Sequence, residues 1–129
     1  PRTKKRFEEW GISPQNIILS EPLRYREFAV LEKHATLVLT DSGGIQEETT
    51  YLGVPCLTMR ENTERPITVS MGTNEVVGKD KEKILESVER ILDGEWKQGK
   101  VPPLWDGNTA ERIVATIKEW LENQGGNKQ

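Results

Sequence analysis

Short apolar runs of strand length alternate along the chain with segments of helical periodicity. The strand-like runs are continuous, as expected for strands buried on both faces of a parallel sheet, and they cover residues 16–19, 36–40, 55–59 and 75–77. A helix is expected before the first of these runs, at residues 3–10, and further helices between the runs at residues 24–34 and 43–52, with a short one from Pro66. This alternation predicts right-handed βαβ units, and therefore an α/β fold with a parallel sheet and helices on both faces.

Two amphipathic helices are expected to close the chain, each with one apolar stripe that we expect to pack into the core. Asp80 and Asn108 are the predicted N-caps, and Gly94 and Gly125 the predicted C-terminal stops. The stripes consist of Ile84, Leu85, Val88, Ile91 and Leu92 in the first helix and Ile113, Val114, Ile117, Trp120 and Leu121 in the second. Residues 1–124 are therefore predicted to form one domain, and residues 125–129 a disordered tail.

Composition narrows the functional classes. A chain of 129 residues can bury a hydrophobic core without disulfides or bound metals. Its net charge of -3 excludes a nucleic-acid binder held by general attraction to phosphates. Cys56 is the only cysteine, which predicts no disulfide, no zinc cluster or other metal site, and a reducing cytoplasmic location. No apolar run approaches the roughly 20 residues of a membrane span. The chain begins at Pro1 without an initiator Met, so we expect a fragment or a processed product.

The most informative stretch is the turn that follows residues 36–40, where Asp41, Ser42, Gly43 and Gly44 precede a helix. A helix start offers unpaired N–H groups and a positive dipole end, and glycines let a phosphate approach the backbone. Glu48 lies about 9 Å further along the helix axis, at ~1.5 Å per residue, which suits the ribose of a nucleotide whose diphosphate sits at the turn. Alternatively, Asp41 or Ser42 merely caps the helix.

A second candidate is the charged loop of residues 60–66, which follows the next strand and is expected at the same rim of the sheet. Pro66 disfavours helical geometry at Arg65, so this guanidinium could face the cleft and bind phosphate. A solvated ion pair with Glu61 or Glu64 is the alternative. The sole histidine, His34, is expected to cap or pack at a helix end, so no catalytic residue is assigned.

Three segments together resemble the non-hydrolysing UDP-N-acetylglucosamine 2-epimerases: residues 40–48 (TDSGGIQEE), 52–55 (LGVP) and 60–66 (RENTERP). The likeness covers most of the chain, from Pro1 to Asn108. It implies a Rossmann-like lobe similar to the C-terminal half of a GT-B fold, with the N-terminal lobe missing. It implies UDP or UDP-N-acetylglucosamine as ligand, no cofactor, and a homodimeric full-length isomerase of polysaccharide biosynthesis.

The resemblance also implies a role for individual residues. Ser42, Gly43 and Gly44 match the turn that holds the diphosphate, Glu48 the ribose ligand and Arg65 a further cleft ligand. Phe28 and the backbone near Leu23 match positions beside the uracil, although Phe28 could equally be a core aromatic. The family's acid–base residues match nothing in this chain, so the isolated chain is expected to bind UDP weakly and to lack turnover. The alternatives are the nucleotide-sugar lobe of a GT-B glycosyltransferase and a non-catalytic UDP-sugar-binding subunit.

Overall fold

The computed structural model describes residues 2–125. The chain divides into two units, one up to Leu31 and one from Glu32 onward. The first unit holds α1 (Arg2–Glu9) and most of α2 (Tyr25–Lys33). The second holds β1 (Val38–Thr40), α3 (Gly43–Leu52), β2 (Cys56–Thr58), α4 (Pro66–Ser70), β3 (Asn74–Val76), α5 (Lys81–Leu92) and α6 (Thr109–Gly125). None of the helices within residues 2–125 is long and apolar enough to cross a membrane.

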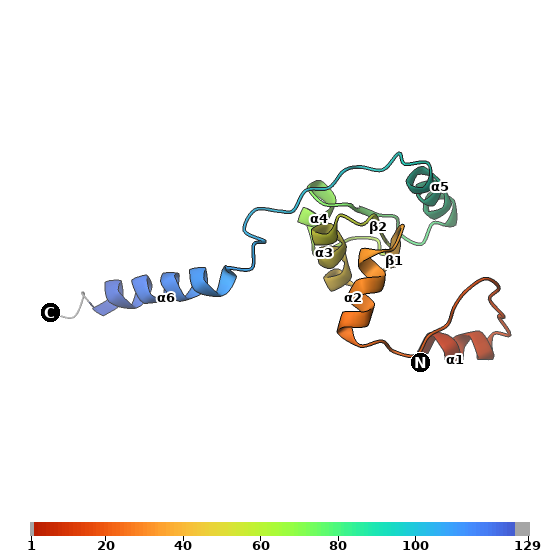
Figure 1. Ribbon diagram of the computed structural model, residues 1–129, viewed down its shortest axis with the longest axis horizontal. Helices are drawn as coiled ribbons and strands as arrows, with labels where there is room; N and C mark the ends of the chain where they lie inside the picture. Colours follow the sequence, from red (N-terminus) through yellow and green to blue (C-terminus); the bar gives the residue numbers. More distant parts are fainter. Residues whose placement is uncertain (1, 126–129) are drawn as a thin grey trace. The chain divides into compact units, whose positions relative to one another are not determined.

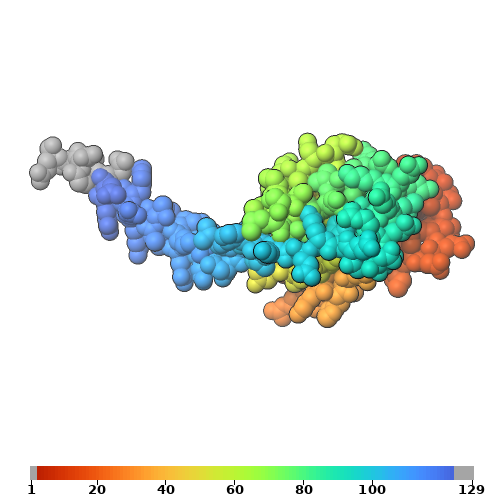
Figure 2. Space-filling view, turned by 90° about the horizontal axis from the view of Figure 1, so that it is seen from above, coloured from red at the N-terminus to blue at the C-terminus, as the bar shows by residue number. Residues whose placement is uncertain are grey.

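The strands form one parallel sheet in the order β1-β2-β3. Val38 pairs with Cys56, and Cys56 in turn pairs with Asn74, so residues in register share a face of the sheet. Helices cover both faces, with α3 and α5 on opposite sides of the strands (Figure 1). The predicted α/β fold is confirmed. The space-filling view shows the second unit from α4 to α5, coloured yellow-green through cyan, as one continuous packed surface (Figure 2).

The face of the sheet toward α5 is apolar. Leu57 and Val77 are almost fully buried there together with Ile91 of α5. Leu37, Met59, Ile84, Val88 and Trp96 pack around them. Three residues of the predicted α5 stripe, Ile84, Val88 and Ile91, therefore serve the core, whereas Leu85 and Leu92 are exposed. The Asp80 carboxylate caps the helix by accepting from the N–H groups of Glu82 and Lys83.

The opposite face is polar, although it is equally well buried. Cys56, Thr58 and Asn74 have no exposed surface, and neither have Gln46 and Thr49 of α3. A buried polar face is stable only if its groups find hydrogen-bond partners within the protein. This side of the sheet is consequently organised by a hydrogen-bond network rather than by apolar contact, and the candidate site lies at its edge.

Two sequence predictions are wrong. Residues 16–19 form no strand: Asn16 has φ 61° and Ile18 is 96 % exposed. The apolar stripe of α6 is exposed rather than buried. Gly125, which was predicted to lie just past this helix, is its last described residue. In both segments the apolar residues predict burial, but burial also requires a second surface to pack against. Within residues 2–125 no such surface covers these segments. Residues 126–129 of the predicted tail lie outside the described part.

Candidate functional site

The glycine turn joins β1 to α3. Ser42 is the N-cap residue of α3, with extended backbone (φ -90°, ψ 128°), and its exposed side chain makes no capping hydrogen bond. Its own N–H donates to the Thr40 hydroxyl at 3.1 Å. The alternative in which Ser42 merely caps the helix is therefore contradicted: its hydroxyl and the first N–H groups of α3 are available to an anion.

Gly43 and Gly44 are not required by the backbone, because neither has a positive φ. Packing does not require them either. A methyl group on Gly43 would lie 3.8 Å from the Arg65 side chain, and one on Gly44 would lie 3.9 Å from the Ser42 hydroxyl, both ordinary contacts. Glycine lowers helix stability relative to alanine. The two glycines thus leave open a space, bordered by Ser42 and Arg65, that the fold itself does not need.

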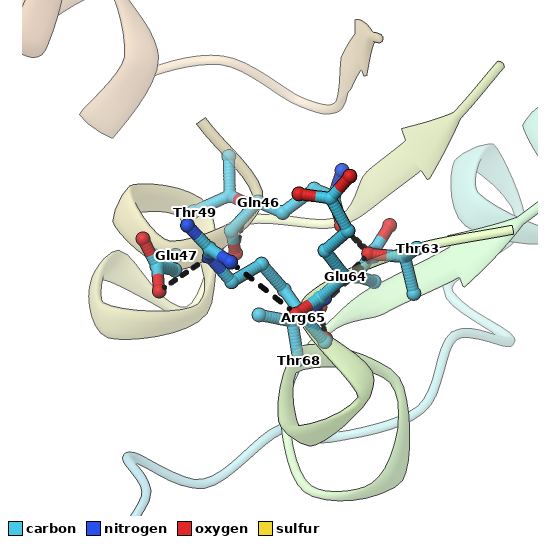
Figure 3. Close-up of polar contacts among 8 residues, drawn as sticks. Gln46, Glu47, Thr49, Thr63, Glu64, Arg65 and Thr68 are labelled. Carbon is cyan, nitrogen blue, oxygen red and sulfur yellow. Dashed lines mark hydrogen bonds and ion pairs between the residues drawn. The ribbon is translucent and has the colours of Figure 1, made fainter. Parts of the chain in front are cut away.

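Arg65 lies beside the glycine turn, so the two candidate segments converge as predicted (Figure 3). Its Nε forms an ion pair with Glu47 Oε1 at 2.9 Å, and both side chains are about two-fifths exposed, at 42 % and 40 %. The expected alternative partners were Glu61 and Glu64, and the observed carboxylate is instead that of Glu47. The Arg65 Nε atom is buried, but ion pairs between partly exposed side chains contribute little stability, so this one does not hold the guanidinium against a competing anion.

A buried network holds the Arg65 loop in place. The side-chain oxygen of Gln46, Oε1, accepts from Thr63 Oγ1 at 2.6 Å and from the Asn74 side-chain amide at 3.1 Å. The same Asn74 amide donates to Thr68 Oγ1 at 3.0 Å. Thr63 Oγ1 then accepts from the Arg65 N–H at 2.9 Å, and Thr68 Oγ1 donates to the Arg65 carbonyl at 2.7 Å (Figure 3). Arg65 is therefore tied on both sides of its α-carbon to the core.

Sequence reasoning missed this network. Gln46, Thr49 and Thr50 occupy the buried face of α3, where an amphipathic helix would carry apolar residues. The sequence did carry one signal: the helix between two predicted strands lacks an apolar stripe, which indicates a polar buried face. Asn74 gave no comparable signal, because it precedes the predicted strand of residues 75–77 in a stretch whose composition is also typical of a turn.

Glu48, the predicted ribose ligand, is half-buried on α3 and lies within hydrogen-bonding reach of Glu32 on α2. Glu32 is only 3 % exposed. Burial, together with a hydrogen bond and charge repulsion from Glu48, raises the pKa of Glu32 to about 7. Sequence reasoning did not single out Glu32, because a glutamate near the end of a helix is ordinarily solvated.

Leu23 and Phe28 belong to the first unit, whereas the site residues described above belong to the second. Leu23 is 40 % exposed and lines a shallow apolar depression with Arg26, Glu27, Val30 and Leu31. Phe28 is half-buried in α2. Their placement beside a uracil remains a prediction.

Comparison with known proteins identifies the family of the chain. The family model described as UDP-N-acetylglucosamine 2-epimerase matches residues 1–118. The enzyme of that name from Methanocaldococcus jannaschii is 49 % identical over 124 residues, which is 91 % of this chain and 33 % of the relative. The Escherichia coli K12 relative is 45 % identical over 81 % of this chain and 29 % of its own length. The chain therefore spans about a third of the curated relatives it matches.

Two solved structures share the fold and carry informative ligands. The Methanocaldococcus jannaschii UDP-GlcNAc 2-epimerase in complex with UDP-GlcNAc and UDP superposes with a TM-score of 0.74 at 47 % identity, over 92 % of this chain and 34 % of that one. The Neisseria meningitidis enzyme bound to UDP-GlcNAc gives a TM-score of 0.78 at 34 % identity, over 92 % and 33 %. Because the family model matches residues 1–118, this chain belongs to the UDP-N-acetylglucosamine 2-epimerase family.

Proposed function

We propose that the chain is the UDP-binding lobe of a UDP-N-acetylglucosamine 2-epimerase. The observation that carries the proposal is the open space at the glycine turn. It is bordered by the start of α3, by the Ser42 hydroxyl, which makes no capping hydrogen bond, and by the Arg65 side chain. Neither the backbone conformation nor the packing of the fold requires glycine there. Amide N–H groups, a hydroxyl and an arginine are the donors that a diphosphate recruits. Glu48, further along the same helix, supplies a carboxylate for the ribose hydroxyls.

In the proposed reaction, UDP-N-acetylglucosamine loses the C2 proton and the C1–oxygen bond to UDP, which leaves a glycal and free UDP. Re-addition of UDP at C1, with a proton delivered to the opposite face of C2, gives UDP-N-acetylmannosamine. Ser42, the α3 amides and Arg65 would stabilise the negative charge that grows on the diphosphate as the C1–oxygen bond breaks. The groups that move the C2 proton would come from a second, N-terminal lobe in a homodimeric cytoplasmic enzyme of polysaccharide biosynthesis.

Binding to the chain itself tests the nucleotide site. We expect Glu48→Gln to weaken UDP by about 1.5 to 3 kcal/mol, the value of a hydrogen bond to a charged group, and to leave inorganic diphosphate nearly unchanged. Ser42→Ala should weaken both ligands by roughly 0.5 to 1.5 kcal/mol. Titration by isothermal calorimetry or amide NMR measures these differences, with Glu86→Gln on the exposed side of α5 as the matched control.

The outcomes separate the parts of the proposal. Equal losses of UDP and diphosphate in Glu48→Gln would remove the ribose assignment. No saturable UDP binding below about 10 mM would remove the nucleotide site altogether. For the division of labour, the isolated chain incubated with UDP-N-acetylglucosamine should form no mannose epimer, and turnover above background would show that this lobe carries its own acid–base residues.

A further inference from the structure

Glu32 is a buried carboxyl that the proposed reaction does not use. It lies near the C-terminal end of α2, between the exposed residues Leu31 and Lys33, yet its own side chain is 3 % exposed. Neither carboxyl oxygen of Glu32 accepts a hydrogen bond from any residue that the structure describes. An ionised carboxylate without a partner is among the most costly groups to bury, so the protein must stabilise Glu32 in another form.

The groups around Glu32 are carboxyl and thiol groups, which can share a proton with it, rather than cations that would pair with its charge. Glu48 of α3 lies within hydrogen-bonding reach, and the Cys56 thiol of β2 is close enough to feel the charge of Glu32. Burial raises the pKa of that thiol, so it stays neutral. In the described part of the chain, neither Glu32 nor Glu48 takes part in an ion pair. One proton shared between the two carboxyls removes the repulsion and supplies the missing donor.

We propose that Glu32 is a positioning residue for the nucleotide: in its protonated form it donates a hydrogen bond to the Glu48 carboxylate and so aims that group at the ribose hydroxyls. This inference rests on the proposed UDP site. A carboxylate has two oxygens, so Glu48 can accept from Glu32 at one and from the ribose at the other. The pKa of about 7 for Glu32 places the loss of that proton close to neutral pH.

Ionisation of Glu32 weakens binding in two ways. The hydrogen bond that orients Glu48 is lost, and a further negative charge is added near an anionic ligand. By linkage, nucleotide binding must in turn raise the pKa of Glu32. Affinity therefore decreases as pH rises through the neutral range, and the titrating group is on the protein.

The decisive measurement is the affinity for UDP-N-acetylglucosamine at about pH 5.5 and about pH 8.5, on either side of the Glu32 pKa. The diphosphate of this probe is a diester and has no proton to lose in that range. We expect the unsubstituted chain to lose about 2- to 10-fold in affinity, as for one net hydrogen bond. Glu32→Gln, whose amide still donates, should keep the low-pH affinity at both pH values, and Glu32→Leu should bind weakly at both.

A ligand-free readout completes the test. The side-chain carbon-13 resonance of Glu32 should titrate near neutral pH, and Glu48→Gln should lower that pKa by removing the neighbouring charge. Binding with no pH dependence, or the same dependence in Glu32→Gln, overturns the inference and leaves the nucleotide site intact. Titration of Glu32 in the ordinary glutamate range overturns it as well. Absence of binding at every pH overturns both the site and the inference.

Discussion

Asn74 is the centre of the buried polar network, and its truncation tests whether that network stabilises the fold. Its side chain is fully buried and makes hydrogen bonds to Thr58 at 2.6 Å, Thr68 at 3.0 Å and Gln46 at 3.1 Å. In Asn74→Ala the Thr58 hydroxyl loses the acceptor it uses. Thr68 and Gln46 each keep one other partner, the Arg65 carbonyl and the Thr63 hydroxyl respectively.

The expected cost follows from this difference. One buried donor left without a partner costs about 1 to 3 kcal/mol, and two weakened acceptors and a small cavity add about 1 kcal/mol more. We therefore expect the free energy of unfolding to decrease by about 2 to 4 kcal/mol, a large share of the ~5 to 15 kcal/mol typical of a domain.

Urea denaturation followed by tryptophan fluorescence measures the change, because Trp96 packs against the core of the same unit. Gln98→Ala, which removes an exposed amide, is the matched control and should change stability by less than about 0.5 kcal/mol. A loss below about 1 kcal/mol for Asn74→Ala, at an unchanged dependence on urea, would refute the view that this face of the sheet depends on the network.

Three further predictions concern other parts of the second unit. Gly43→Ala should leave thermal stability unchanged or slightly higher, since the methyl group meets only ordinary contacts, while UDP and diphosphate affinity decrease in calorimetry; unchanged affinity would mean that no ligand occupies the open space. Gly72→Ala should destabilise by roughly 3 kcal/mol or more in chemical denaturation, because the new carbon would lie 2.3 Å from Thr50 Oγ1 and 2.5 Å from the Thr68 carbonyl oxygen; near-native stability would show that these groups can move apart. The folded pKa of Glu32 lies above its unfolded value of 4.5, so its protonated form stabilises the fold fully below pH 4.5, and this contribution is lost as pH rises through about 7. Urea denaturation at several pH values across that range measures the free energy of unfolding of the unsubstituted chain and of Glu32→Gln. We expect the value for the unsubstituted chain to decrease relative to that of the variant by at most about 3 kcal/mol, and parallel pH profiles would contradict the raised pKa.

Much of the fold follows from the sequence because its determinants are local. Apolar runs bounded by turn residues predicted β1, β2 and β3, with ends correct to within two residues. Caps acted as expected: Gly53, with φ 73°, ends α3, and Pro66 begins α4. The same local patterns were insufficient at residues 16–19 and in α6, where burial requires a distant surface.

The candidate site, too, was determined partly by local sequence and partly by tertiary structure. The order of residues along the chain determined that Ser42, Gly43 and Gly44 stand at the start of one helix and Glu48 further along it, since helical spacing alone places them. Only the tertiary structure decided the rest: Arg65 reaches the glycine turn because Gln46 and Asn74, 28 positions apart, meet by a hydrogen bond across a sheet face. The ionisation of Glu32 was likewise decided in three dimensions, because a pKa depends on burial and on a neighbouring carboxyl from another helix.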